Sequence, residues 1–174
     1  DHGTSRGLGD VYKRQFLMPQ ARISALGLDV GRKRMGVAGC DGTGLIATGI
    51  TTIRRTSFQQ DIAQLQTIVK ERQAQLLVVG LPYSMNGSIG FQGREIQRYA
   101  QRLSQTLELP VEYVDERLTS VQAEEMLKAA NISPSQNKDL IDRKAAALIL
   151  QQWLDERREK STQLTEKLGL KPRP

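Results

Sequence analysis

Four acidic residues lie near the ends of predicted strands or helices, where carboxylates could support metal-dependent chemistry. Asp29 interrupts the apolar run LGLDV, Asp115 and Glu116 follow the strand-like segment VEYV, and Asp142 shares a helical face with alanine and isoleucine. A carboxylate in a buried strand costs several kcal/mol unless a cation compensates its charge. Clustered carboxylates are tolerated when they hold Mg²⁺ or Mn²⁺, and two such ions can assist phosphodiester hydrolysis. The pattern therefore predicts a carboxylate metal site.

Each of these acids also has an ordinary structural explanation. Asp29 could form a turn ahead of Gly31, and either Asp115 or Glu116 could cap a helix or lie at the surface. Asp142 could be an acid in the first turn of a helix, where the helix dipole favours negative charge. All of these acids lie at strand or helix ends that face one region. One metal site explains this shared location better than a separate structural role for each acid.

The composition limits the chemistry that is available. The chain of 174 residues has a net charge of +6 and a pI near 9.7, which favours a polyanionic partner such as nucleic acid over a merely soluble basic protein. The only histidine is His2 and the only cysteine is Cys40. With His2 in a segment that we expect to lie outside the fold, His-dependent catalytic triads and His-ligated zinc are excluded. A lone cysteine fits a reducing compartment.

The chain is predicted to form one folded domain with two less ordered ends. Residues 1–17 lack periodicity and read as a non-native leader, residues 18–160 as a single domain, and residues 161–174 as a flexible polar tail. No stretch approaches the ~20 apolar residues of a membrane span, and no secretory signal is recognisable. We therefore expect a cytoplasmic protein with no membrane association.

Hydrophobic periodicity predicts three strands in hairpins, followed by alternating helices and strands. This order implies an α/β fold with a mixed five-stranded sheet and helices on both faces. The continuous apolar run LLVVGL predicts a central strand buried on both sides. The expected strands are 22–30, 34–41, 45–53, 76–81 and 111–114, and the expected helices are 57–73, 92–107, 119–130 and 137–160.

Two groups of residues are candidates for phosphate binding. Lys33 and Arg34 in the first hairpin, and Arg117 after the acidic pair, could position a nucleic-acid backbone. Arg34 could instead pair only with a neighbouring acid. The glycine-containing loop before the helix at 92–107 adds Ser88, Gln92 and Arg94, and it could equally be a plain connection.

Four motifs together resemble the YqgF/RuvX family, which is also described as Holliday-junction-resolvase-like and as a pre-16S rRNA nuclease family. They are LDVGRKRMGVAGCD, VVGLPYSMNGSIGFQ, VDERLTSVQAEEML and IDRKAAALILQQWL. They occur in the order typical of the family and cover most of residues 25–155. The resemblance extends neither to residues 1–17 nor to the C-terminal tail.

The resemblance implies a ribonuclease H-like fold and a metal-dependent nuclease that trims the 5′ end of the 16S rRNA precursor. Carried over by position, Asp29, Glu116 and Asp142 would be the catalytic residues and the ligands of Mg²⁺ or Mn²⁺. Successive strand residues face opposite ways, so only one of Asp115 and Glu116 should reach the metal, and we favour Glu116. The implied partner is precursor rRNA, with a ribosomal particle as a further candidate, in a monomer or a homodimer.

Three other functions are compatible with parts of the sequence. The same fold and acids would serve a resolvase of four-way DNA junctions, because phosphate contacts carry no substrate identity. The segment DVGRKRMGVA also resembles the first phosphate-binding turn of the sugar-kinase and heat-shock ATPases, which need two such halves. A non-catalytic nucleic-acid-binding or transcription factor would explain the basic charge, but it would not explain three converging acids.

Overall fold

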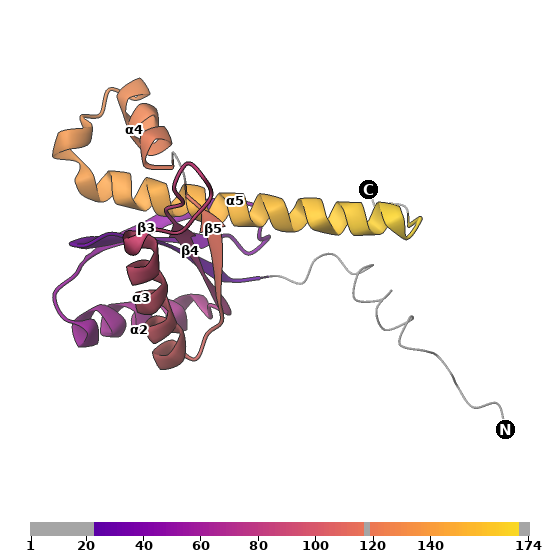
Figure 1. Ribbon diagram of the computed structural model, residues 1–174, viewed down its shortest axis with the longest axis horizontal. Coiled ribbons are helices and arrows are strands. Elements are labelled where there is room, and N and C mark those ends of the chain that lie inside the picture. Colours follow the sequence, from indigo (N-terminus) through magenta and orange to yellow (C-terminus); the bar gives the residue numbers. More distant parts are fainter. Residues whose placement is uncertain (1–22, 117–118, 171–174) are drawn as a thin grey trace.

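The computed structural model describes residues 23–116 and 119–170, with five strands, four α-helices and one short 3₁₀ helix (Figure 1). The strands are β1 (Ala25–Val30), β2 (Arg34–Cys40), β3 (Ala47–Arg54), β4 (Leu76–Leu81) and β5 (Val111–Asp115). The α-helices are α2 (Phe58–Arg72), α3 (Phe91–Leu107), α4 (Thr119–Ala129) and α5 (Lys138–Lys167), and the 3₁₀ helix η1 covers Pro134–Gln136.

The strands form one mixed sheet in the order β3-β2-β1-β4-β5. The hairpin pairs β1–β2 and β2–β3 are antiparallel, whereas β1–β4 and β4–β5 are parallel. Helices α2 and α3 cover one face of the sheet and α5 crosses the other (Figure 1). The expected fold class, a ribonuclease H-like mixed sheet with helices on both faces, is confirmed.

The alternation of side chains along β1 separates two hydrophobic cores. Leu26 and Leu28 point into the core shared with α2 and α3, whereas Ala25 packs into the core beneath α5. Every residue of β4 is buried, as its continuous apolar run predicts for a central strand. Asp29 follows the alternation and therefore lies on the α5 side of the sheet.

Two helix boundaries show what the sequence can and cannot specify. Helix α2 begins after Ser57, whose hydroxyl accepts a hydrogen bond from the Gln60 amide at 3.2 Å, as expected for a serine cap. The end of the last helix at residue 160 is wrong, because α5 continues to Lys167. This last part of α5 extends beyond the sheet and is mostly polar, so no burial pattern marks it (Figure 1). Within residues 23–116 and 119–170, no helix combines the length and apolarity needed to span a bilayer.

Candidate active site

The carboxyl-terminal ends of β1 and β5 bring Asp29 and Glu116 together. Glu116 lies one residue beyond β5, and its amide donates a hydrogen bond to the Leu81 carbonyl at 3.1 Å, which extends the pairing with β4. A Cβ atom built on Gly80 would lie 2.5 Å from Glu116 Oε2. The absence of a side chain at Gly80 therefore leaves the space over β4 through which Glu116 reaches Asp29.

Helix α5 carries Asp142 to the same place by approaching the sheet very closely. Gly36 pairs with Asp29 in the β1–β2 ladder, and a Cβ atom at Gly36 would lie only 1.9 Å from the Asp142 carbonyl oxygen. No other residue type fits at this position without moving the helix. Gly36 therefore determines how near Asp142 lies to Asp29.

These three acids have unusual electrostatics. Burial, the charge of Asp142 and a hydrogen bond with Glu116 act on Asp29, and the net effect raises its pKa to about 6. Burial and the charges of Asp29 and Asp115 raise the pKa of Glu116 to about 7. The two carboxyl groups lie close enough to share a proton, so they titrate as a coupled pair. Loss of that proton leaves two adjacent negative charges.

Asp142 has a partner of its own. Its Oδ2 atom accepts a hydrogen bond from Arg34 Nε at 2.6 Å, while Asp139 lies 3.9 Å from the same nitrogen. Asp142 therefore influences Asp29 through its charge but is directly bonded to Arg34. The pairing of Arg34 with a neighbouring acid, one of the two alternatives from the sequence, is present in the structure.

The other predicted phosphate-binding residues are more widely distributed. Lys33 is exposed in the β1–β2 turn, and the Ser88 hydroxyl is hydrogen-bonded to Ser84 and Asn86 within its own loop. Arg94 donates a hydrogen bond to the Ile89 carbonyl at 3.2 Å, and Gln92 lines a pocket on the α3 side of the sheet. Arg117 lies outside the described residues. A role in substrate binding stays a prediction for all of them.

The structure adds two cations that the sequence analysis missed. Lys128 of α4 and Lys138 of α5 line a cavity of about 630 Å³ together with Arg34 and Asp142. Lys138 lies four residues before Asp142 on one helix, so their helical spacing was a signal that could have been used. Lys128 could not be found in this way, because only the packing of α4 against α5 brings it to the site.

Comparison with known proteins supports one family. A sequence profile of RuvX, described as a Holliday junction resolvase, matches residues 23–156. The chain belongs to the RuvX family. Proteins named "Putative pre-16S rRNA nuclease" from Trichormus variabilis and from Crocosphaera subtropica are 75% and 68% identical to it over 136 and 137 residues. These matches cover 78% and 79% of this chain, and 90% and 96% of the two relatives.

Solved structures with a related arrangement share little sequence with this RuvX protein. The T. thermophilus RuvC in complex with a Holliday junction substrate is 14% identical, with a TM-score of 0.49 over 78% of this chain and 96% of that chain. The Fowlpox virus resolvase with Holliday junction DNA is 11% identical, with a TM-score of 0.44 over 77% and 98%.

The acids of this RuvX protein have the donor chemistry of a divalent-metal site. Asp29 and Glu116 supply adjacent carboxylate oxygens, which are the ligands that Mg²⁺ and Mn²⁺ prefer. Among the described residues, no three acidic, histidine or cysteine side chains lie close enough together to hold one metal ion. Asp142 instead accepts a hydrogen bond from Arg34 at 2.6 Å. The donor chemistry of the Asp29–Glu116 pair therefore fits a divalent cation, and Asp142 as a third ligand stays a prediction.

Proposed function

We propose that this chain is a metal-dependent nuclease that processes the 5′ end of precursor 16S rRNA, with Asp29, Glu116 and Asp142 as its catalytic acids. The observation that carries the proposal is the hydrogen-bonded Asp29–Glu116 pair, whose pKa values are raised to about 6 and about 7. Perturbed carboxylates at a strand edge are typical of functional sites. Family membership and the names of the relatives support nuclease chemistry and the rRNA substrate.

In this proposal, Asp29 and Glu116 hold Mg²⁺ or Mn²⁺ and Asp142 contributes the third carboxylate. The ion supplies Lewis-acid polarisation of a phosphodiester oxygen and stabilises the negative charge that develops there. Asp29 and Glu116 must release their shared proton before they bind the ion, so binding strengthens as the pH rises through about 6 to 7.

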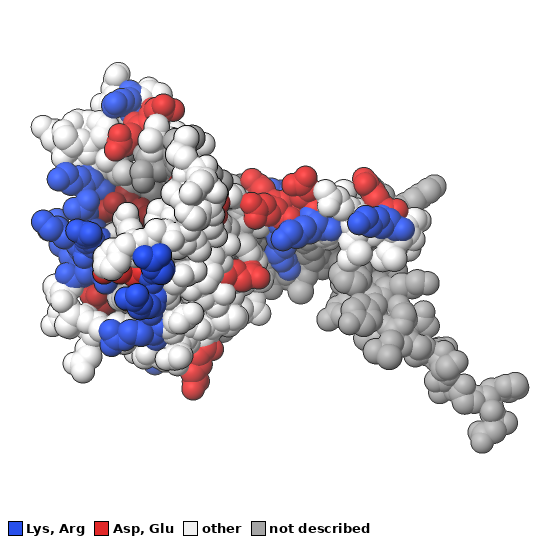
Figure 2. Space-filling view, in the orientation of Figure 1, with Lys and Arg blue, Asp and Glu red and all other residues white. Residues whose placement is uncertain are grey.

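Basic side chains next to the acids would hold the substrate. Arg34, Lys128 and Lys138 line the cavity beside Asp142, together with Glu124, and their positive charges would attract backbone phosphates there. Arg34 then has two roles, because it neutralises Asp142 before a metal binds and becomes available to a phosphate afterwards. Figure 2 shows Lys and Arg side chains gathered over this end of the molecule, with acidic side chains between them.

The decisive experiment is cleavage of a precursor 16S rRNA leader by the purified protein with Mg²⁺ or Mn²⁺. We expect Asp29→Asn and Glu116→Gln each to reduce kcat by about 10²- to 10³-fold, because each removes transition-state stabilisation worth several kcal/mol. The matched control is Glu166→Gln, which changes an exposed acid near the far end of α5 and should keep full activity. Equal cleavage by Asp29→Asn and the parent protein would rule out the carboxylate mechanism.

A four-way DNA junction is the second candidate substrate, because the matching family profile is described as a Holliday junction resolvase. Competition between the rRNA leader and a synthetic four-way junction separates the two substrates. Preferential inhibition of rRNA cleavage by unlabelled junction would favour the resolvase. Backbone binding in EDTA without cleavage in any metal would favour a non-catalytic nucleic-acid-binding protein.

A further inference from the structure

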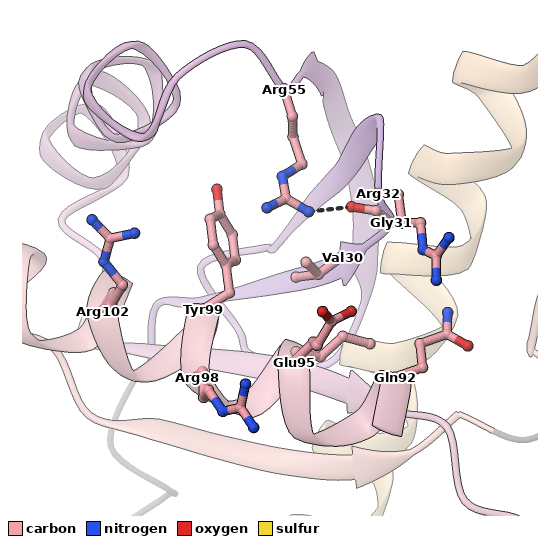
Figure 3. Close-up of a pocket in the computed structure, with 10 residues that line it drawn as sticks. Val30, Gly31, Arg32, Arg55, Gln92, Glu95, Arg98, Tyr99 and Arg102 are labelled. Atoms are coloured by element: carbon pink, nitrogen blue, oxygen red, sulfur yellow. Dashed lines mark hydrogen bonds between the residues drawn. The ribbon is translucent and has the colours of Figure 1, made fainter. Parts of the chain in front are cut away.

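A second basic site lies on the opposite face of the sheet from the three acids. A pocket of about 480 Å³ opens between the β1–β2 turn and α3, and it is lined by four arginines: Arg32, Arg55, Arg98 and Arg102. Figure 3 shows these side chains approaching the pocket from the turn, from the segment after β3 and from α3. We refer to it below as the arginine pocket.

Two of the arginines are held in place by the protein itself. Arg55 lies 4.1 Å above the Tyr99 ring, donates a hydrogen bond to the Gly31 carbonyl and approaches Asp61 at 4.0 Å (Figure 3). Arg102 lies 4.0 Å above the ring of Phe58. These contacts orient two guanidinium groups at the pocket and balance the charge of one of them.

The other two arginines have no compensating charge nearby except one exposed acid. Within residues 23–116 and 119–170, neither Arg32 nor Arg98 forms an ion pair, and both side chains are exposed. Glu95 is the single carboxylate that lines the pocket. With Arg55 balanced by Asp61, three arginines face one glutamate, so the arginine pocket attracts anions.

The spacing along α3 extends this positive surface. Arg94, Arg98 and Arg102 are four residues apart and therefore lie along one face of the helix. Like charges at this spacing repel each other and destabilise a helix, so a folding role does not explain the row. Figure 2 shows Lys and Arg side chains gathered over α3. An extended polyanion fits such a row better than a small anion does.

The arginine pocket and the acids lie close together along the chain. Asp29 and Val30 are consecutive residues that face opposite sides of the sheet, and Val30 lines the arginine pocket. Arg32 is three residues beyond Asp29, so their Cα atoms are at most about 11 Å apart. A nucleic-acid strand carries one phosphate per about 3.4 Å of helix axis, and successive phosphates are further apart than this rise, so a strand can pass from one site to the other within a few nucleotides.

We propose that the arginine pocket binds backbone phosphates of a single-stranded RNA segment that flanks the phosphate cleaved at Asp29 and Glu116. This inference rests on the proposed nuclease function and adds the path that the RNA strand follows over the protein. The strand crosses the end of β1 from the α5 side of the sheet to the α3 side. Arg32 and Arg98 contact its phosphates, and Arg102, which is held over the ring of Phe58, adds a fixed positive charge beside them.

The first test measures binding of a fluorescent single-stranded RNA of about 12 nucleotides by anisotropy, in the Asp29→Asn background to prevent cleavage. Adding Arg32→Ala and Arg98→Ala together should lower affinity about tenfold and reduce the slope of log affinity against log salt by about 1.4, or 0.7 per contact. The matched control is the pair Lys160→Ala and Lys167→Ala, which removes two exposed positive charges from the distal part of α5.

The second test measures cleavage with intact Asp29, using a dinucleotide and an RNA of about 12 nucleotides, since a dinucleotide has a single phosphodiester and cannot occupy both sites at once. The double arginine variant should lose kcat/KM only on the longer RNA. Unchanged affinity and salt slope in the first test would overturn the proposal that the arginine pocket binds RNA. Equal losses of kcat/KM on both RNAs in the second test would overturn it as well. If the parent protein cleaves no RNA, the proposed nuclease function fails, and the binding measurement still decides whether the arginine pocket holds RNA.

Discussion

Two aspartates, one on each face of the sheet, have opposite surroundings. Asp61 of α2 is 2% exposed and is fully partnered: it accepts hydrogen bonds from the Thr56 amide at 3.2 Å and from the Tyr99 hydroxyl at 3.4 Å, with Arg55 at 4.0 Å. Asp29 instead lies beside two other acids, Glu116 and Asp142. The protein compensates the charge of the first carboxylate itself, whereas in our proposal a divalent metal would compensate the charge of the second. Such unbalanced acids mark functional rather than structural sites.

The two faces also differ in how their charged groups are held. On the α5 side, glycines let backbone and carboxylates approach closely, so the geometry of the acids is fixed by rigid elements. On the α3 side, long arginine side chains reach the pocket from exposed positions, and two of them rest on aromatic rings. The first arrangement suits chemistry at one point, and the second suits contact with a polymer along its length.

The largest expected effect on stability follows from removing the negative charge of Asp61. Asp61→Asn should lower the free energy of unfolding by about 2–3 kcal/mol, because it weakens charge-assisted hydrogen bonds and leaves Arg55 without a balancing charge. Urea unfolding at neutral pH measures this change. An unchanged midpoint would mean that the contacts around Asp61 do not stabilise the fold.

A smaller loss should follow when the close approach on the α5 side is disturbed. Gly36→Ala places a methyl group 1.9 Å from the Asp142 carbonyl oxygen, so α5 must shift away from β2. We expect a loss of about 1–3 kcal/mol, as for overpacked cores, together with reduced cleavage. Gly42→Ala is the matched control, since nothing lies within 4 Å of its Cβ position. Thermal unfolding of both variants compares them, and equal stability would contradict the tight contact.

The smallest effect should have the opposite sign and depend on pH. The folded-state pKa values of Asp29 and Glu116, about 6 and about 7, lie above their unfolded values near 4. The folded protein therefore binds more protons between pH 4 and 7, and its stability falls as the pH rises through that range. Asp29→Asn removes one of these charges, so we expect it to be more stable than the parent protein at pH 8 by about 1 kcal/mol, after allowance for partial exposure.

The same comparison at low pH provides the control. At pH 4.5 both carboxyl groups are largely protonated in the folded state, so the stability difference between Asp29→Asn and the parent protein should nearly vanish. Urea unfolding in EDTA at pH 4.5 and pH 8 measures it. A difference that is the same at both pH values would show that repulsion between these acids does not limit stability.

Much of the fold could be predicted because its signals are local. The uninterrupted apolar run of β4, the serine cap at Ser57 and the turn residues between the first strands each act within a few positions, and the observed elements agree with them. The last turns of α5 lack such a signal, because they bury few side chains and contain mainly polar residues. The expected helix end at residue 160 was wrong for this reason.

The sequence suggests which acids belong to the candidate site, but not which hydrogen bonds those acids form. The sequence places Asp29, Glu116 and Asp142 at the ends of elements, strand alternation implies that only one of Asp115 and Glu116 reaches the site, and the family resemblance favours Glu116. It does not show that Asp29 and Glu116 share a hydrogen bond while Asp142 binds Arg34. Nor does it reveal the arginine pocket, whose members come from a turn, the end of a strand and a helix.

The sequence by itself determined the chemical inventory of this protein: a basic chain, three candidate catalytic carboxylates, and a histidine only at position 2. These properties depend on residue type and on spacing along one strand or helix. The tertiary structure decided which charges meet, because Arg34 and Asp142 are 108 positions apart and are joined only by the packing of α5 against β2. Electrostatic interactions depend on distances in space, and the close approach of α5 to β2 at Gly36 is one that residue spacing along the chain does not reveal.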